Sequence, residues 1–162
     1  MKIIEAKPEE AETIRIVMQS AFEEYKNDSP PSGAMEETTE SIEIAVRNKE
    51  EIAAVCYMND KPAGIVRVKE DGDALYFFRL SVLPDKRGNG IGRALVRWVE
   101  DKAVLLGKST VYCKVRASTP QNVKRYEEMG YSIFDRYTAE KPGKPAFKVI
   151  SMKKQIGKAY YE

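Results

Sequence analysis

A glycine-rich loop between an apolar strand and an amphipathic helix limits the folds open to this chain more than any other feature. Residues 74–83 are aromatic and apolar, residues 84–89 favour a loop, and residues 90–106 carry apolar side chains at helical spacing. A second strand is expected at 110–115. A strand, a helix and another strand in this order form a right-handed crossover between parallel strands. The sequence therefore predicts a sheet that contains a parallel strand pair.

Patterns on both sides of this unit predict more strands and helices. Residues 52–58 and 63–69 alternate as strands do and flank a hairpin turn. Further helices are expected at 7–26, 36–48 and 119–129, and further strands at 2–6, 131–138 and 147–153. This mixture predicts an α/β or α+β fold, with a mixed sheet that has helices on both faces.

Composition favours a single folded domain in the cytoplasm. The chain has 162 residues, of which 43% are hydrophobic and 32% charged, which suits one core and argues against long disorder. Its longest apolar run, 52–58, is too short to cross a bilayer, and its first residues lack the apolar centre of a signal peptide. We expect one domain at 1–154, no membrane partner, and a C-terminal tail at 155–162. The tail is either a frayed end or a homodimer contact.

The chain contains no histidine. Zinc sites of the Cys/His kind and catalytic triads that use imidazole are therefore excluded, and no metal is expected. Cys56 and Cys113 lie far apart in the sequence, and we expect both to be buried hydrophobic side chains in a reduced, cytoplasmic protein.

Charge is distributed unevenly along the chain. Residues 1–60 carry 14 acidic and 6 basic side chains, whereas residues 61–162 carry 11 acidic and 21 basic ones. Either the halves differ by chance, or the second half binds an anionic ligand and the first lines a site for a cation. A nucleic-acid partner is not expected, because the chain has no run of five basic residues and no basic helical stripe.

The loop after residue 83 is the place where an anion is expected to bind. A loop between a strand and a helix start offers free backbone N–H groups and the positive end of the helix dipole, and both favour phosphate. The loop matches neither the Walker pattern nor the dinucleotide fingerprint, because Arg93 stands where the latter needs glycine. What remains is Arg-x-x-Gly-x-Gly, formed by Arg87, Gly90 and Gly92. The alternative is a glycine-rich turn without a ligand.

Two signatures together resemble the GCN5-related N-acetyltransferase (GNAT) family. In that family Arg/Gln-x-x-Gly-x-Gly/Ala joins the fourth strand to the third helix and holds the pyrophosphate of acetyl-coenzyme A (acetyl-CoA). Downstream, Asn122 and residues 126–131 resemble the family's Asn-x3-Tyr-Glu-x-x-Gly-Phe/Tyr signature. The order of expected elements agrees over nearly the whole chain. The resemblance implies a mostly antiparallel mixed sheet with a central parallel strand pair.

The resemblance also implies a role for each matching residue. Leu80 and Val82 would present main-chain groups to the pantetheine arm and the acetyl carbonyl, and Asn122 would hydrogen-bond the arm. Tyr126 would be the general acid for the departing thiolate; the alternative is a ring that packs in the core. Backbone N–H groups of the loop would bind the pyrophosphate, and the residues concerned are Arg87, Gly88, Asn89, Gly90, Ile91, Gly92 and Arg93.

The implied function is acetyl transfer from acetyl-CoA to a primary amine of a small molecule or a protein, by direct attack. The general base is open, because residues 76–81 contain no carboxylate. Glu24, Asp28, a water chain or bulk solvent could serve. The missing carboxylate also keeps open an alternative, a non-catalytic module that binds acetyl-CoA or CoA as a sensor or regulator.

The early acidic residues suggest a hypothesis about the acceptor amine. In the family resembled, the first two helices and their connection border the acceptor site. That segment contains Glu23, Glu24, Asp28, Glu36, Glu37 and Glu40, opposed before residue 40 by Lys26. Such a cluster would attract cations, which predicts a preference for polyamines or lysine-like groups. The alternative is an acidic helix face exposed to solvent.

Overall fold

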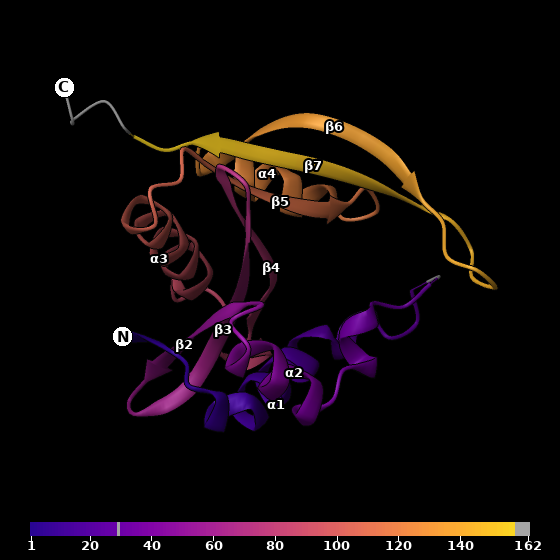
Figure 1. Ribbon diagram of the computed structural model, residues 1–162. Coiled ribbons are helices and arrows are strands. Elements are labelled where there is room, and N and C mark those ends of the chain that lie inside the picture. The colour runs from indigo at the N-terminus through magenta and orange to yellow at the C-terminus, as the bar shows by residue number, and fades with distance from the viewer. Residues whose placement is uncertain (29, 158–162) are drawn as a thin grey trace.

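A seven-stranded sheet organises residues 1–28 and 30–157, the residues that the computed structural model describes (Figure 1). The helices are α1 (Ala11–Phe22), α2 (Thr39–Arg47), α3 (Ile91–Leu105) and α4 (Pro120–Glu128). The strands are β1 (Lys2–Glu5), β2 (Ile52–Met58), β3 (Lys61–Asp71), β4 (Ala74–Val82), β5 (Thr110–Arg116), β6 (Ser132–Ala139) and β7 (Phe147–Gln155). No helix among the described residues is both long and apolar enough to span a membrane.

The sheet is mixed, as the sequence predicts. Its strand order is β1-β2-β3-β4-β5-β7-β6. The β4–β5 pair is parallel and the other five neighbouring pairs are antiparallel. Helix α3 connects the two parallel strands, so the expected strand–helix–strand unit lies at the centre of the sheet. The expected fold class is confirmed.

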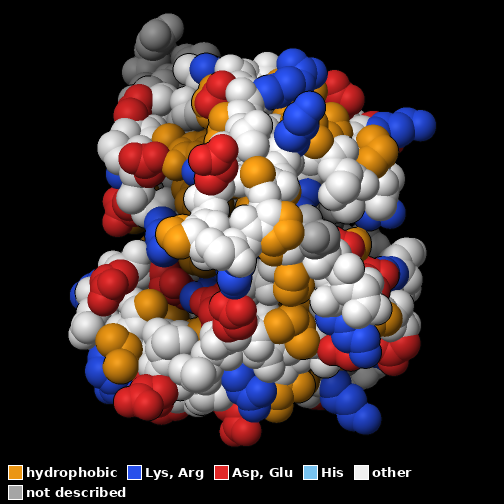
Figure 2. All heavy atoms as spheres, turned by 90° about the vertical axis from the view of Figure 1, so that its right-hand side faces the viewer, with side chains coloured by type: hydrophobic (Ala, Val, Ile, Leu, Met, Phe, Trp, Pro, Cys, Tyr) orange, Lys and Arg blue, Asp and Glu red, His pale blue; other side chains and the backbone are white. Residues whose placement is uncertain are grey.

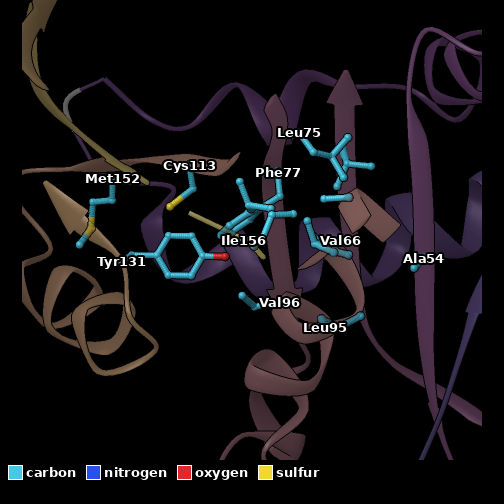
Figure 3. Packing of buried hydrophobic residues seen from close by; sticks show 14 of the residues in the cluster. Ala54, Val66, Leu75, Phe77, Leu95, Val96, Cys113, Tyr131, Met152 and Ile156 are labelled. Carbon is cyan, nitrogen blue, oxygen red and sulfur yellow. The ribbon is translucent and has the colours of Figure 1, made fainter. Parts of the chain in front are cut away.

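Two hydrophobic clusters hold helices to opposite faces of the sheet, because successive strand side chains point to opposite sides. On one face, Leu75 and Phe77 of β4 pack with Leu95 and Val96 of α3 and with Cys113 of β5 (Figure 3). On the other face, α1 and α2 cover β2 and β3; the side chains involved include Ile14, Val17, Met18, Ile42, Val55 and Ile65. The helices thus leave part of the second face, over β5 to β7, without a helical cover (Figure 1).

Helix α2 begins later than the sequence pattern suggests. The expected helix starts at 36, but Gly33–Glu36 forms a separate 3-10 turn. Thr38 then caps α2: its side chain accepts from the Ser41 N–H, and the Ser41 hydroxyl accepts from the Thr38 N–H, each at 3.1 Å. This cap leaves Glu37 between the two helical segments, free to pair with residues of the sheet.

The end of the domain that the sequence predicts, residue 154, falls inside the last strand. Strand β7 runs to Gln155, and Ile156 is buried, with its N–H donating to the Ser109 carbonyl at 2.9 Å. The first two residues of the expected tail at 155–162 therefore belong to the folded domain. Residues 158–162, for which we weighed a frayed end against a dimer contact, lie outside the described residues.

A buried ion pair connects β3 to Glu51, the residue that precedes β2. The Arg67 guanidinium, 3% exposed, donates to both carboxylate oxygens of Glu51, at 2.6 and 3.0 Å. It also donates from Nη1 to Glu37 Oε1 at 2.8 Å. Removing one partner of a buried pair leaves an uncompensated charge, which costs far more than losing an exposed pair.

We expect Glu51→Gln to destabilise the protein by about 3 kcal/mol, because it removes the negative charge that balances Arg67 in the core. Glu43→Gln is the control, since the Glu43–Arg47 pair is exposed on α2, and its cost should stay below about 0.5 kcal/mol. Equilibrium unfolding in urea measures both. Equal midpoints for the two variants would contradict the importance of the buried pair.

Candidate active site

Strands β4 and β5 part after a short parallel contact. Tyr76 and Tyr112 are their last paired residues, although β4 continues to Val82 and β5 to Arg116. A cavity of about 410 Å³ lies where they diverge. It is lined by residues 76–80 of β4, 113–116 of β5, and parts of the α1–α2 and β6–β7 connections. Figure 2 shows the side of the molecule that bears these two connections, where hydrophobic side chains and both signs of charge are exposed together.

A bulge in β4 accompanies the divergence. The register of β3 against β4 shifts between Ile65 and Arg67, which gives β4 an extra residue. Arg79 in this bulge has φ 55°, a left-handed conformation that non-glycine residues seldom adopt. Its guanidinium donates to Glu37 at 3.0 Å and to the Ser32 hydroxyl at 3.1 Å. The ion pairs of Glu37 thus hold the bulge to the segment between α1 and α2.

Tyr126 comes from α4 and lines the cavity. Its ring packs edge-on against Phe77, with centroids 5.7 Å apart, and its hydroxyl makes no hydrogen bond to another described residue. Burial raises the pKa of Tyr126, so its hydroxyl carries its proton at neutral pH. Asn122, one turn earlier on α4, also lines the cavity, and its side-chain oxygen accepts from Arg125 at 3.1 Å.

Leu80 and Val82 lie on the part of β4 that β5 no longer pairs with. Leu80 lines the cavity. Val82 is opposite Gly64 of β3, and the next residue, Leu83, donates its N–H to the Ala63 carbonyl at 2.8 Å. Because successive N–H groups of a strand point to opposite edges, the Val82 N–H faces the edge that β5 has left. It is available to a ligand there.

The glycine-rich loop leads directly into α3. Gly90 is the N-cap residue, and the N–H groups of Ile91, Gly92 and Arg93 have no acceptor within the helix because they form its first turn. Gly88 and Gly90 have φ 83° and 77°, and a Cβ built on either would meet no atom within 4 Å. The loop is therefore an open cradle of N–H groups at the positive end of a helix.

Glu24 and Asp28, the two acidic residues expected near the substrate, lie in different surroundings. Glu24 pairs with Arg87 of the loop at 2.6 Å, and this hydrogen bond lowers the pKa of the Glu24 carboxyl. Glu24 is not among the residues that line the cavity, whereas Asp28 is. The structure thus brings Asp28 together with Tyr126, Asn122 and Leu80 around one cavity and places Glu24 beside the loop.

Most of the early acidic cluster takes part in ion pairs, which weakens the argument for the expected cation preference. Asp28 is the one member of the cluster in the lining of the cavity. The pairs are Glu23 with Lys26, Glu24 with Arg87, Glu36 with Lys144, and Glu37 with Arg67 and Arg79. Their basic partners lie mostly far away in sequence, so a count along the segment could not reveal them.

Sequence reasoning missed the cations of the cavity. Arg79, Lys114, Arg116 and Lys141 all line it. The alternation of β5 already indicated that Lys114 and Arg116 lie opposite the buried face, but not that this face stays without a helical cover.

The cysteines and the remaining polar groups offer neither a nucleophile nor a metal site. Cys56 and Cys113 are both buried and free, as expected. Burial raises the pKa of the Cys113 thiol to about 12, so it is protonated although it lines the cavity. Within the described part of the chain, no group of three Cys, Asp or Glu side chains is arranged to hold a metal ion.

Comparisons with known proteins agree with this arrangement. The sequence model of the acetyltransferase (GNAT) family matches residues 18–131. An acetyltransferase from Pectobacterium atrosepticum is 29% identical over 100 residues, which cover 62% of this chain and 71% of that protein. The [ribosomal protein bS18]-alanine N-acetyltransferase of Escherichia coli K12 is 31% identical over 74 residues, 46% of this chain and 50% of that protein. The match thus spans half the length of that enzyme.

The fold is shared with solved acetyltransferases. The crystal structure of an aminoglycoside 6′-N-acetyltransferase complexed with coenzyme A superimposes with a TM-score of 0.72 at 19% identity, covering 97% of this chain and 98% of that one. At this identity the likeness bears on the fold alone.

We expect Gly92→Val to abolish the thermal stabilisation that acetyl-CoA gives while leaving the free protein folded. A side chain here would occupy the cradle of N–H groups, yet the nearest atom to a Cβ at this position is Val82 Cγ2 at 3.9 Å. Gly90 is unsuited to the test because its positive φ would strain any substituted residue. Differential scanning fluorimetry with and without acetyl-CoA measures the effect.

Asp101→Val, which places the same residue on an exposed turn of α3, is the control and should keep the shift. An undiminished shift for Gly92→Val would show that the loop does not hold the cofactor.

Proposed function

Since the chain belongs to the acetyltransferase (GNAT) family, we propose that it is an acetyl-CoA-dependent N-acetyltransferase. It transfers the acetyl group to a primary amine of a small molecule or a protein by direct attack. The observation that carries this proposal is the cavity between the diverging β4 and β5, where the unpaired hydroxyl of Tyr126 lies opposite the strand that leads to the loop. The family match and the named relatives support acyltransferase activity.

The residues present fit acetyl-CoA. The first turn of α3 offers unpaired N–H groups beside open space at Gly88 and Gly90, which suits a pyrophosphate. Leu80 and Asn122 line the cavity and are available to the pantetheine arm. When bound, acetyl-CoA supplies an acetyl group activated as a thioester.

Two donors in this proposal act on opposite sides of the bond that breaks. The Val82 N–H, free at the edge that β5 has left, donates to the acetyl oxygen as negative charge develops on it. The Tyr126 hydroxyl, kept protonated by its raised pKa, donates its proton to the departing sulfur. Asp28 is the acidic side chain in the lining, and we assign it the role of taking a proton from the substrate ammonium, directly or through water, so that the neutral amine can attack. Glu24 is the weaker choice because Arg87 holds its carboxylate.

A second candidate function rests on one observation. Strand β4 has Arg79, not a carboxylate, at its bulge, and the guanidinium is held by Glu37. A module that binds acetyl-CoA without turnover would need no base there. A screen of amines that follows release of free thiol separates the two. Thiol released in proportion to an added amine supports the enzyme, whereas cofactor binding without release supports the module.

We expect Tyr126→Phe to lower kcat by roughly 10²-fold with unchanged affinity for acetyl-CoA, because it removes the proton donor and leaves the ring in place. Tyr131→Phe is the matched control. It removes the hydroxyl of the neighbouring ring, a hydroxyl that donates to Glu100 at 2.8 Å. Single-turnover kinetics isolate the chemical step. An unchanged rate for Tyr126→Phe would make Tyr126 a packing residue.

A further inference from the structure

The charges that line the cavity are mostly positive. Its lining contains four cationic residues, Arg79, Lys114, Arg116 and Lys141, and one acidic residue, Asp28. This is the reverse of what the acidic early segment suggests. Residues 87–93 of the loop are not in the lining, so these cations are separate from the groups proposed for the pyrophosphate.

Three of the cations form no ion pair with another described residue. Arg79 is paired with Glu37, but no carboxylate of the described residues lies within ion-pair distance of Lys114, Arg116 or Lys141. The guanidinium carbon of Arg116 lies 4.1 Å from the centroid of the Phe147 ring, and the guanidinium donates hydrogen bonds to the carbonyls of residues 30 and 31. Rings and carbonyls orient a cation without cancelling its net charge.

The two cations of β5 flank the opening of the sheet. Lys114 and Arg116 are two residues apart and on the same side of the strand, roughly 7 Å along it, past the last residue that pairs with β4. The Lys114 ammonium lies over the rings of Tyr76 and Tyr137, at 5.5 and 5.6 Å. Both side chains project away from the buried face that carries Cys113. Both line the cavity, each held by its aromatic contacts, and both can donate to an anionic group there.

Asp28 completes the arrangement. It lines the same cavity. Burial lowers the pKa of the Arg116 guanidinium, and the negative charge of Asp28 partly opposes this effect. A ligand with one ammonium and one anionic group would find a partner for each end.

We propose that the acceptor is a primary amine that also bears an anionic group, a carboxylate or a phosphate, bound by Lys114 and Arg116 with Lys141 at the rim, while Asp28 faces the amine. This inference rests on the proposed function and names its substrate class. It reverses the preference for polyamines that the sequence suggests.

The test compares amines of matched chain length that differ in charge at the far end. γ-Aminobutyrate and aminopropyl phosphate are the anionic probes, γ-aminobutyramide is neutral, and putrescine is cationic. The C-terminally amidated tripeptides Ala-Glu-Ala and Ala-Gln-Ala, which lack the terminal carboxylate, make the same comparison for a peptide amine. We expect kcat/KM to be about tenfold higher for the anionic member of each set, with the difference shrinking as salt rises. The two anionic probes distinguish a carboxylate from a phosphate.

Variants assign the preference to residues. Lys114→Gln and Arg116→Gln should each reduce the anionic preference several-fold, mainly through KM, and Lys114→Glu should invert it. Lys69→Gln is the matched control: the Lys69 ammonium also lies over a ring, 5.0 Å from the centroid of Phe78, but Lys69 does not line the cavity. It should change neither kcat nor KM.

A binding measurement keeps the test independent of turnover. Ligand-observed NMR on the CoA-saturated protein compares N-acetyl-γ-aminobutyrate with N-acetylputrescine. Tighter binding of the anionic product, lost in Lys114→Gln, supports the inference even for slow substrates. Equal or reversed binding and rates, with acetyl-CoA still stabilising the protein, would overturn the inference and leave the proposed function standing. Loss of acetyl-CoA stabilisation itself would instead contradict the proposed function.

Discussion

The parting of β4 from β5 is the constraint on which the rest of the structure depends. The pair begins as an ordinary parallel ladder and ends at Tyr76 and Tyr112, whose rings stack at 4.8 Å. Beyond them, backbone groups on the facing edges lose their partners, which is costly unless a ligand or water replaces them. The Val82 N–H, the Tyr126 hydroxyl and the cations of β5 all lie beside that opening. If β4 and β5 were paired along their whole length, the facing strand edges would be buried and no cavity would form between them.

A chain of ion pairs keeps the opening in shape. Glu51 balances Arg67 in the core, Glu37 accepts from Arg67 and also from Arg79, and Arg79 sits in the bulge of β4. Removing charges from water is expensive, so such a chain is stable only when each member is paired, and among the described residues no buried side-chain polar atom lacks a partner. These ion pairs hold the segment between α1 and α2 against the bulge of β4. Glu37 and Glu51 therefore hold the architecture together, whereas Asp28 lies in the lining of the cavity.

The sequence predicts the local features and fails where distant segments meet. Helical and alternating periodicity located the strands and α3 closely, and the spacing of Arg87, Gly90 and Gly92 located the loop. These signals are local, because each depends on neighbours within a few residues. The pairs Glu37–Arg67 and Glu24–Arg87 are not local, and neither is the bulge at Arg79, which needs the register of β3 against β4. The charge of the cavity depends on which distant residues come together in its lining, so it could not be predicted from charge counts along the chain.

Two neighbouring tyrosines differ in the partners that the fold gives to their hydroxyls. The rings of Tyr126 and Tyr131 pack edge-on, with centroids 6.1 Å apart, and burial raises the pKa of both. The Tyr131 hydroxyl donates to Glu100, which also holds Lys154, so its proton is committed to a contact between α3 and β7. The Tyr126 hydroxyl has no such partner among the described residues and lines the cavity. Of these two hydroxyls, the one with a carboxylate partner is that of Tyr131, and the proton transfer that we propose for Tyr126 depends on this difference.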